Sequence, residues 1–103
     1  MNRLLLLAAL TLSPSVHAET NAQITIKAFA FGPAALTVPA GTTVVWINQD
    51  VEPHTVVSND QKFQSEALDT GDRFSVTFDK PGSYGYFCSL HPHMTGKVVV
   101  TAK

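Results

Sequence analysis

Short stretches in which apolar and polar residues alternate constrain the fold of this chain more than any other feature of its sequence. In residues 72–78, Phe74, Val76 and Phe78 lie on one side of an extended chain, with polar residues between them. Successive side chains of a β-strand point to opposite faces, so this pattern predicts a strand with one buried face. Similar stretches, bounded by turn-forming residues, occur at residues 23–31, 35–38, 42–48, 54–58, 83–88 and 97–102.

The composition of residues 19–103 supports an all-β fold. This part of the chain contains ten Val, ten Thr and three Ile but only three Leu. β-Branched side chains suit pleated sheets, and no window of useful length shows helical periodicity. A set of about seven to eight short strands with turns between them predicts one domain, a Greek-key β-sandwich.

Residues 1–18 have the three-part layout of a secretory signal peptide. Arg3 supplies a basic start, residues 4–12 are largely apolar, and Ala18 closes a cleavage site. The alternative is a transmembrane anchor, but nine helical residues rise only ~14 Å, whereas a hydrocarbon core is ~30 Å thick. We therefore expect cleavage after Ala18 and a periplasmic domain of residues 19–103 that does not insert into the membrane.

The charge of the chain limits its partners. The formal net charge is -1, and without residues 1–18 six Lys and Arg oppose eight Asp and Glu, a net charge of -2. This balance argues against nucleic acid as a partner, because phosphate binding needs clustered positive charge. So small a net charge favours docking through apolar surface over strong electrostatic steering. We expect the protein to be a monomer.

One segment carries most of the chemistry. Cys88, His91 and Met94 stand at steps of three residues after the strand at residues 83–88, and His54 begins a strand far upstream. These four side chains converge if the loop curls and meets His54 at one end of the sandwich. Thiolate with thioether favours copper over magnesium or calcium, and methionine is a poor ligand for zinc. Two imidazoles, a thiolate and a long axial Met form the ligand set of an electron-transfer copper site, so the pattern predicts one copper per chain.

Each of these residues also has a structural interpretation when it is taken singly. Cys88 would be an ordinary buried thiol, Met94 would fill a gap in the core, and His91 would be a surface histidine. The joint spacing behind a strand favours the metal site. Metal ligation also explains why an exported chain carries one unpaired cysteine, since two are needed for a disulfide.

These residues resemble those of the cupredoxins, the small blue copper proteins, and the resemblance covers essentially the whole of residues 19–103. Two residues separate Cys88 from His91 and two separate His91 from Met94, a short spacing that is similar to that of the amicyanins within the family. The resemblance rests also on Phe29-Ala30-Phe31, Val45-Trp46-Ile47-Asn48-Gln49-Asp50, Pro53-His54 and the run from Pro81 to Cys88.

The resemblance implies a function and a docking surface. Copper would cycle between Cu(II) and Cu(I), and single electrons would enter and leave through an exposed His91. Redox partner proteins would dock on an apolar patch around this histidine, for which Pro53, Leu90 and Pro92 are the candidates. The implied copper ligands are His54, Cys88, His91 and, weakly, Met94.

Two positions depart from the amicyanin pattern. Thr55 stands where an asparagine braces the ligand loop, and its hydroxyl can still bond across to the loop near Ser89. His93 replaces an aromatic residue and puts a titratable group in the docking patch. The amicyanins' partner, methylamine dehydrogenase, is therefore not carried over to this chain. We also expect Asn48 to hydrogen-bond the ligand region.

Together these features predict a periplasmic electron carrier. The alternative is copper sequestration or delivery, although one closed site on a rigid sandwich suits retention better than handover. We expect no enzymatic activity. Multicopper oxidases and nitrite reductases use such domains, but they need further copper sites and longer chains, and residues 19–103 hold only three His.

Overall fold

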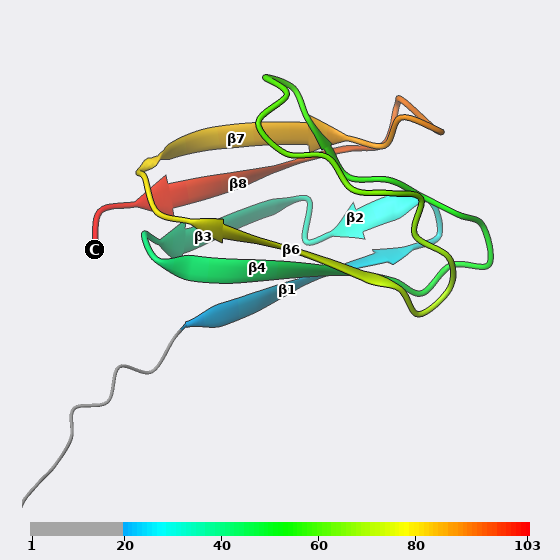
Figure 1. Ribbon diagram of the computed structural model, residues 1–103, viewed down its shortest axis with the longest axis horizontal. Helices are drawn as coiled ribbons and strands as arrows, with labels where there is room; N and C mark the ends of the chain where they lie inside the picture. Colours follow the sequence, from blue (N-terminus) through cyan, green and yellow to red (C-terminus); the bar gives the residue numbers. More distant parts are fainter. Residues whose placement is uncertain (1–19) are drawn as a thin grey trace, which may run out of the picture.

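The computed structural model describes residues 20–103, which fold as an all-β sandwich (Figure 1). The expected signal peptide at residues 1–18 lies outside the described residues. Eight strands form two four-stranded sheets, which confirms the expected fold class. Within residues 20–103, no helix has the length and apolar character that crossing a membrane requires. The strands are β1 (Asn21–Lys27), β2 (Ala30–Gly32), β3 (Ala35–Pro39), β4 (Thr42–Asn48), β5 (Val57–Ser58), β6 (Arg73–Phe78), β7 (Gly82–Phe87) and β8 (Thr95–Thr101).

The two sheets are mixed, and the chain passes between them repeatedly. One sheet has the strand order β2-β1-β4-β6, and the other has the order β3-β8-β7-β5. β1 runs parallel to β4 and β3 runs parallel to β8, whereas β7 and β8 form an antiparallel pair. Every connection from β2 to β7 crosses between the sheets. As a result, several connecting loops meet at the end of the sandwich drawn on the right of Figure 1.

The core lies between the sheets, and alternate residues of the strands fill it as the sequence pattern predicts. In β4, the side chains of Val44, Trp46 and Asn48 are buried, and the residues between them are half-buried. The Trp46 ring packs edge-on against Tyr86 of the opposite sheet, with ring centroids 5.2 Å apart. This contact joins the two layers at the centre of the molecule.

The prediction of one strand across residues 23–31 is wrong, because a tight turn divides the segment into β1 and β2. Ala28 and Phe29 form the turn with φ angles of 54° and 59°. L-residues rarely adopt this left-handed region, which usually calls for Gly or Asn. The Asp50 side chain holds the turn, since its two oxygens accept hydrogen bonds from the N–H groups of Ala28 at 2.8 Å and Phe29 at 2.9 Å. No local residue signals the turn, and its partner is distant in sequence.

The strand expected at residues 54–58 is shorter in the structure. Only Val57 and Ser58 form a strand, and His54 instead makes an isolated antiparallel bridge to Leu68. The bridge consists of two backbone hydrogen bonds, from His54 N to Leu68 O at 3.1 Å and from Leu68 N to His54 O at 2.7 Å. It fixes the backbone of His54 against the β5–β6 connection.

Gly96 of β8 has no side chain, and the Tyr86 ring occupies the space that a side chain there would need. Replacing Gly96 with alanine is therefore expected to destabilise the protein. A Cβ at this position would lie against the hydroxyl of Tyr86 and 2.5 Å from its Cζ, and Tyr86 is almost fully buried. We expect Gly96→Ala to lower the free energy of unfolding by about 1–3 kcal/mol, because overpacking a core forces it to shift. Urea unfolding of the metal-free protein measures this change.

A matched control for Gly96→Ala is available in the adjacent strand. At Gly85 of β7, an added Cβ would meet chiefly the side-chain amide of Asn59, an exposed residue whose side chain can move aside. Gly85→Ala should therefore destabilise the protein less than Gly96→Ala. Equal losses in the two variants would contradict the packing argument.

Candidate metal centre

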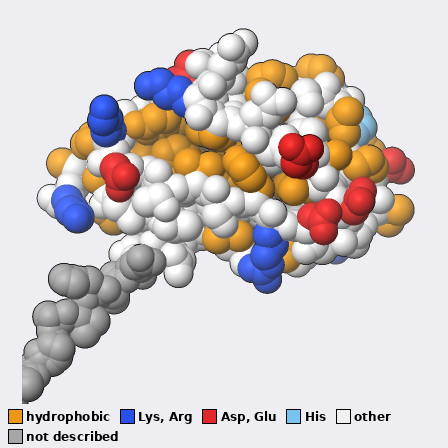
Figure 2. Space-filling view, in the orientation of Figure 1, with side chains coloured by type: hydrophobic (Ala, Val, Ile, Leu, Met, Phe, Trp, Pro, Cys, Tyr) orange, Lys and Arg blue, Asp and Glu red, His pale blue; other side chains and the backbone are white. Residues whose placement is uncertain are grey.

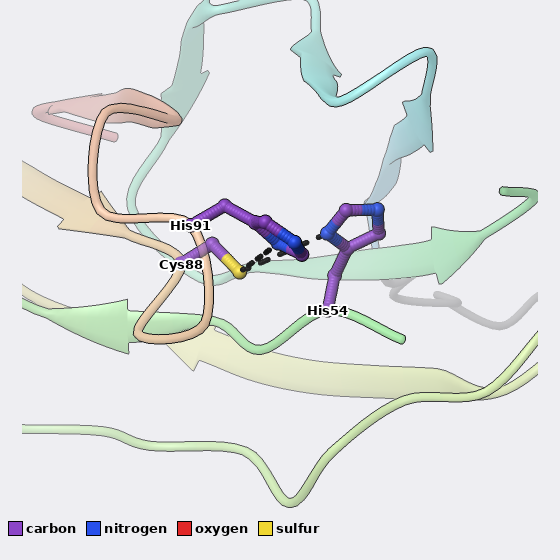
Figure 3. A group of neighbouring side chains, drawn as sticks. All are labelled: His54, Cys88 and His91. Carbon is purple, nitrogen blue, oxygen red and sulfur yellow. Dashed lines mark hydrogen bonds between the residues drawn. The ribbon is translucent and has the colours of Figure 1, made fainter. Parts of the chain in front are cut away.

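Three side chains from two connections meet at the loop end of the sandwich (Figure 3). Cys88 and His91 belong to the β7–β8 loop, and His54 belongs to the β4–β5 connection. Their potential ligand atoms all lie within 4.8 Å of one another. Cys88 Sγ is 3.8 Å from His54 Nδ1 and 3.7 Å from His91 Nδ1. The structure thus brings together three of the four residues that the sequence marked as ligands.

The β7–β8 loop curls because consecutive backbone hydrogen bonds close it at intervals of three residues. His91 N donates to Cys88 O at 3.2 Å, and Met94 N donates to His91 O at 2.9 Å. The loop closes where Cys88 N donates to Met94 O at 3.1 Å. Met94 is buried and belongs to the same apolar cluster as Cys88. The three-residue spacing therefore becomes a tight loop that keeps Cys88 and Met94 buried and leaves His91 partly exposed.

Thr55 supports both the sulfur atom and the loop. Its backbone N–H donates to Cys88 Sγ at 3.3 Å. Its hydroxyl lies 2.8 Å from the hydroxyl of Ser89 and accepts a hydrogen bond from Ser89 N at 2.7 Å. The expected bond from Thr55 to the loop near Ser89 is confirmed, so threonine ties the two connections together at this position.

The surroundings of Cys88 favour its thiolate form. Burial raises the pKa of the thiol, but hydrogen bonds from the Thr55 and Leu90 N–H groups and from the two imidazoles outweigh burial and lower the pKa to about 6. The thiolate, not the thiol, ligates metals. A metal ion can therefore bind at neutral pH with little competition from a proton on the sulfur.

Asp50 orients the His54 ring. Asp50 Oδ2 lies 2.8 Å from Nε2 of the fully buried His54. The Phe29 N–H lowers the pKa of Asp50, burial opposes this effect, and His54 and the Ala28 N–H lower the pKa further. An ionised carboxylate can only accept a hydrogen bond, so Nε2 donates to Asp50, and Nδ1, which faces Cys88 Sγ, is the ring nitrogen left to bind a metal.

Asn48 holds the connection that carries His54, as the sequence predicts. Its side-chain amide donates to Glu52 O at 2.9 Å and to Leu68 O at 2.8 Å. Its side-chain oxygen accepts a hydrogen bond from Asp50 N at 2.9 Å. Asn48 is fully buried, so these bonds fix the segment before His54 from inside the core.

Phe29 is a site residue whose role sequence reasoning missed. Its ring packs edge-on against His54, with centroids 5.2 Å apart, and against His91, with centroids 4.8 Å apart. The left-handed turn that Asp50 holds carries Phe29 to this position, and local sequence patterns do not reveal that turn. Phe29, Val51 and Leu90 are the large exposed apolar side chains of the described residues, at 43%, 89% and 49% exposure. All three lie on connections at the end that holds His91, and Leu90, Pro53 and Pro92 are exposed as the sequence predicts.

The donor set fits copper. Metal bonds to histidine nitrogen and cysteine sulfur measure about 2.0–2.3 Å, so one ion fits between a sulfur and two nitrogens that lie 3.7–3.8 Å from it. Two imidazoles and a thiolate, with a buried thioether nearby in sequence, are the donors of trigonal electron-transfer copper sites. His54 and Cys88 are fully buried, and only His91 opens the group to solvent.

Comparisons with known proteins agree with this chemistry. A family model described as a cupredoxin-like domain matches residues 2–100. Amicyanin of Paracoccus versutus is 40% identical over 70 residues, which cover 63% of this chain and 53% of the amicyanin. Plastocyanin of Scenedesmus fuscus is 34% identical over 87 residues, which cover 74% of this chain and 89% of the plastocyanin. The chain thus spans about half the length of the amicyanin and most of the plastocyanin.

Solved structures show the same relationship. A purple cupredoxin from Nitrosopumilus maritimus is 41% identical with a TM-score of 0.75, over 78% of this chain and 99% of the other. The crystal structure of amicyanin from Paracoccus versutus is 34% identical with a TM-score of 0.73, over 84% of this chain and 85% of the other. A copper-containing nitrite reductase from Thermus scotoductus is 30% identical with a TM-score of 0.77, but the match covers only 25% of that longer chain.

Proposed function

The chain belongs to the cupredoxin family of blue copper electron-transfer proteins, and we propose that it carries single electrons between redox partner proteins through one type 1 copper. The ligands in this proposal are His54, Cys88 and His91, with Met94 as a weak fourth ligand. The observation that carries the proposal is the convergence of Cys88 Sγ with two imidazole Nδ1 atoms at one end of the sandwich.

Each part of the site has a distinct task in this proposal. Bound copper supplies a one-electron couple between Cu(II) and Cu(I). Cys88 provides the thiolate, and the Thr55 N–H and the buried surroundings hold it in place. His54 is fixed by Asp50 from behind and by Phe29 from the side. Little of this framework needs to move when the charge of the centre changes by one unit, which favours rapid electron transfer.

His91 is the point at which electrons enter and leave in this proposal. Of the three clustered ligands, only His91 is partly exposed. Its neighbour Leu90 and the contacting Phe29 are both exposed apolar side chains. An apolar surface around an exposed ligand lets a partner approach closely and exclude water, which shortens the path for the electron.

The proposal assigns no bond-forming chemistry to this chain. A copper-containing nitrite reductase has a domain of similar fold, but the match covers 25% of that enzyme. The three clustered side chains, together with Met94, fill the coordination positions of the proposed site and leave none for a substrate. We place the protein in the periplasm on the basis of the signal-peptide layout of residues 1–18.

Spectroscopy of the copper-loaded protein tests the proposed function. We expect strong visible absorption from thiolate-to-copper charge transfer, which disappears on reduction and returns on oxidation, and an EPR signal that changes in step. A colourless copper-loaded protein would refute the proposal. Transfer of copper to a metal-free acceptor faster than electron exchange with a redox partner would instead support copper delivery, the alternative function.

A further inference from the structure

The charges of this chain are distributed unevenly around the proposed electron port. Two connections, residues 49–53 and 66–72, flank His54 and are joined by a hydrogen bond from the Thr70 hydroxyl to Asp50 O. The second connection is also bonded to Asn48, which directly precedes the first, from Gly71 N to Asn48 O at 2.7 Å and from Asn48 N to Asp72 O at 3.0 Å. We call these two connections the acidic collar. They carry five of the seven acidic residues of the described chain: Asp50, Glu52, Glu66, Asp69 and Asp72.

Few positive charges lie near the acidic collar. Lys27 at the end of β1 and Arg73 at the start of β6 are the basic residues that adjoin it. The other basic residues of the described chain, Lys62, Lys80, Lys97 and Lys103, lie elsewhere. Figure 2 shows several acidic side chains gathered at the end of the molecule where a histidine surfaces, with a Lys or Arg side chain below them, and further Lys and Arg side chains mixed with acidic ones toward the opposite end. The small net charge expected from the sequence therefore averages over an excess of acidic residues at the collar and an excess of basic residues in the rest of the described chain.

The acidic collar lies at the same end of the molecule as a group of exposed apolar side chains. Glu52, Asp69 and Asp72 are exposed, as are the apolar side chains of Phe29, Val51 and Leu90 at the same end. Val51 lies within the collar itself, beside Glu52. A surface on which apolar side chains lie beside charges of one sign selects a partner with the complementary arrangement, because the charges steer the encounter while apolar contact supports the complex.

We propose that the redox partner of this chain is a protein whose exposed apolar redox edge is ringed by Lys and Arg, which seat against the acidic collar while the edge meets His91. This inference rests on the proposed function and adds the chemistry of the partner to it. One electron passes in each encounter: the copper changes between Cu(I) and Cu(II), and the partner's centre changes by one electron in the opposite sense.

A c-type cytochrome whose haem edge is ringed by lysines serves as a probe for this partner. The same cytochrome with its lysines succinylated, so that the rim becomes negative, serves as the matched probe. Stopped-flow absorbance of the haem measures the second-order rate constant of electron transfer between the cytochrome and the copper-loaded protein. The reaction is followed in the direction that the two reduction potentials favour. We expect the native cytochrome to react at least about ten-fold faster than the succinylated form at low ionic strength, and added salt to reduce this difference.

Two double variants remove the same charge from different places. Glu52→Gln with Asp69→Asn neutralises two acids of the collar, and Asp60→Asn with Asp79→Asn neutralises the two acids of the described chain outside it. We expect the collar variant to slow the native cytochrome about three- to ten-fold and the outer variant to slow it less than about two-fold. Unchanged visible spectra check that the four substitutions leave the copper site intact.

Several outcomes would overturn this proposal. Equal effects of the two double variants would mean that only the net charge matters, and rates that do not depend on salt would mean that docking is apolar alone. Faster reaction with the succinylated form would point to a partner with an acidic rim. Sedimentation that shows a dimer, together with loss of electron exchange on dimerisation, would mean that a second copy of the chain covers the surface around His91. If the copper-loaded protein shows no visible band and exchanges no electrons, the proposed function itself is refuted. That result differs from each of the outcomes above.

Discussion

Replacing Cys88 with serine is expected to abolish the visible absorption of the copper-loaded protein. The absorption arises from charge transfer out of a thiolate, and a serine hydroxyl supplies neither the sulfur orbitals nor an ionised ligand at neutral pH. The thiol has a pKa lowered to about 6 by its hydrogen bonds and the two imidazoles, whereas an alcohol stays protonated. We also expect weaker copper binding, since the soft ligand that favours copper is lost.

The Cys88→Ser experiment has internal controls. The absorption spectrum and copper stoichiometry are measured on the same sample, so that loss of colour is separated from loss of metal. Cys88 is fully buried, and serine is smaller and more polar, so unfolding of the metal-free variant is recorded alongside. His93→Gln is the control in the same loop, because His93 is exposed and lies outside the cluster of ligand atoms. Retention of the visible band in Cys88→Ser would refute the assignment of Cys88.

Replacing Asp50 with alanine is expected to weaken copper binding by about 10–100-fold, the usual effect of losing a carboxylate that orients a histidine ligand. The substitution leaves Nε2 of the buried His54 without its acceptor. It also releases the N–H groups of Ala28 and Phe29, which hold the left-handed turn. The turn carries Phe29, so the packing against His91 loosens as well. Competition with a copper chelator measures the affinity.

Asp50→Asn separates the charge of the carboxylate from its hydrogen bonding. Asparagine keeps one acceptor oxygen, so we expect it to restore part of the affinity lost in Asp50→Ala. It also removes a negative charge beside His54, which favours the less positive Cu(I) state, so the reduction potential should rise. Asp69→Asn is the matched control, because it removes an exposed charge in the neighbouring connection that does not contact His54. If Asp50→Asn and Asp69→Asn shift the potential equally, Asp50 acts only through long-range charge.

The fold could be predicted largely from the sequence because its strands are amphipathic. β4 shows the period of two clearly, with Val44, Trp46 and Asn48 inside, and its predicted bounds match the structure. The β1–β2 turn could not be predicted, because Ala28 and Phe29 do not favour left-handed geometry. That conformation depends on a carboxylate about twenty residues away in the chain, and local propensity contains no information about such a partner.

The proposed ligand set could be named from the sequence because three of its members lie in one short loop. Cys88, His91 and Met94 follow a strand at fixed spacing, and the hydrogen bonds that curl the loop join these same three residues. Phe29 and Val51 could not be recognised as neighbours of the site. The β1–β2 turn, which the sequence does not predict, places Phe29 beside the site. Val51 is 89% exposed, and the sequence alone does not distinguish an exposed valine from a buried one.

The sequence by itself determined the all-β class and supplied the proposed donor atoms, which favour a soft metal, because side-chain period and ligand chemistry are local properties. Only the tertiary structure decided how those donors are held and what they face. Asp50 reaches His54, Thr55 reaches Cys88 and Ser89, and two acidic connections join beside exposed apolar side chains through contacts between distant segments. The net charge shows the physical reason most plainly: a sum over the chain contains no positions, and the field that a partner meets depends on where each charge lies.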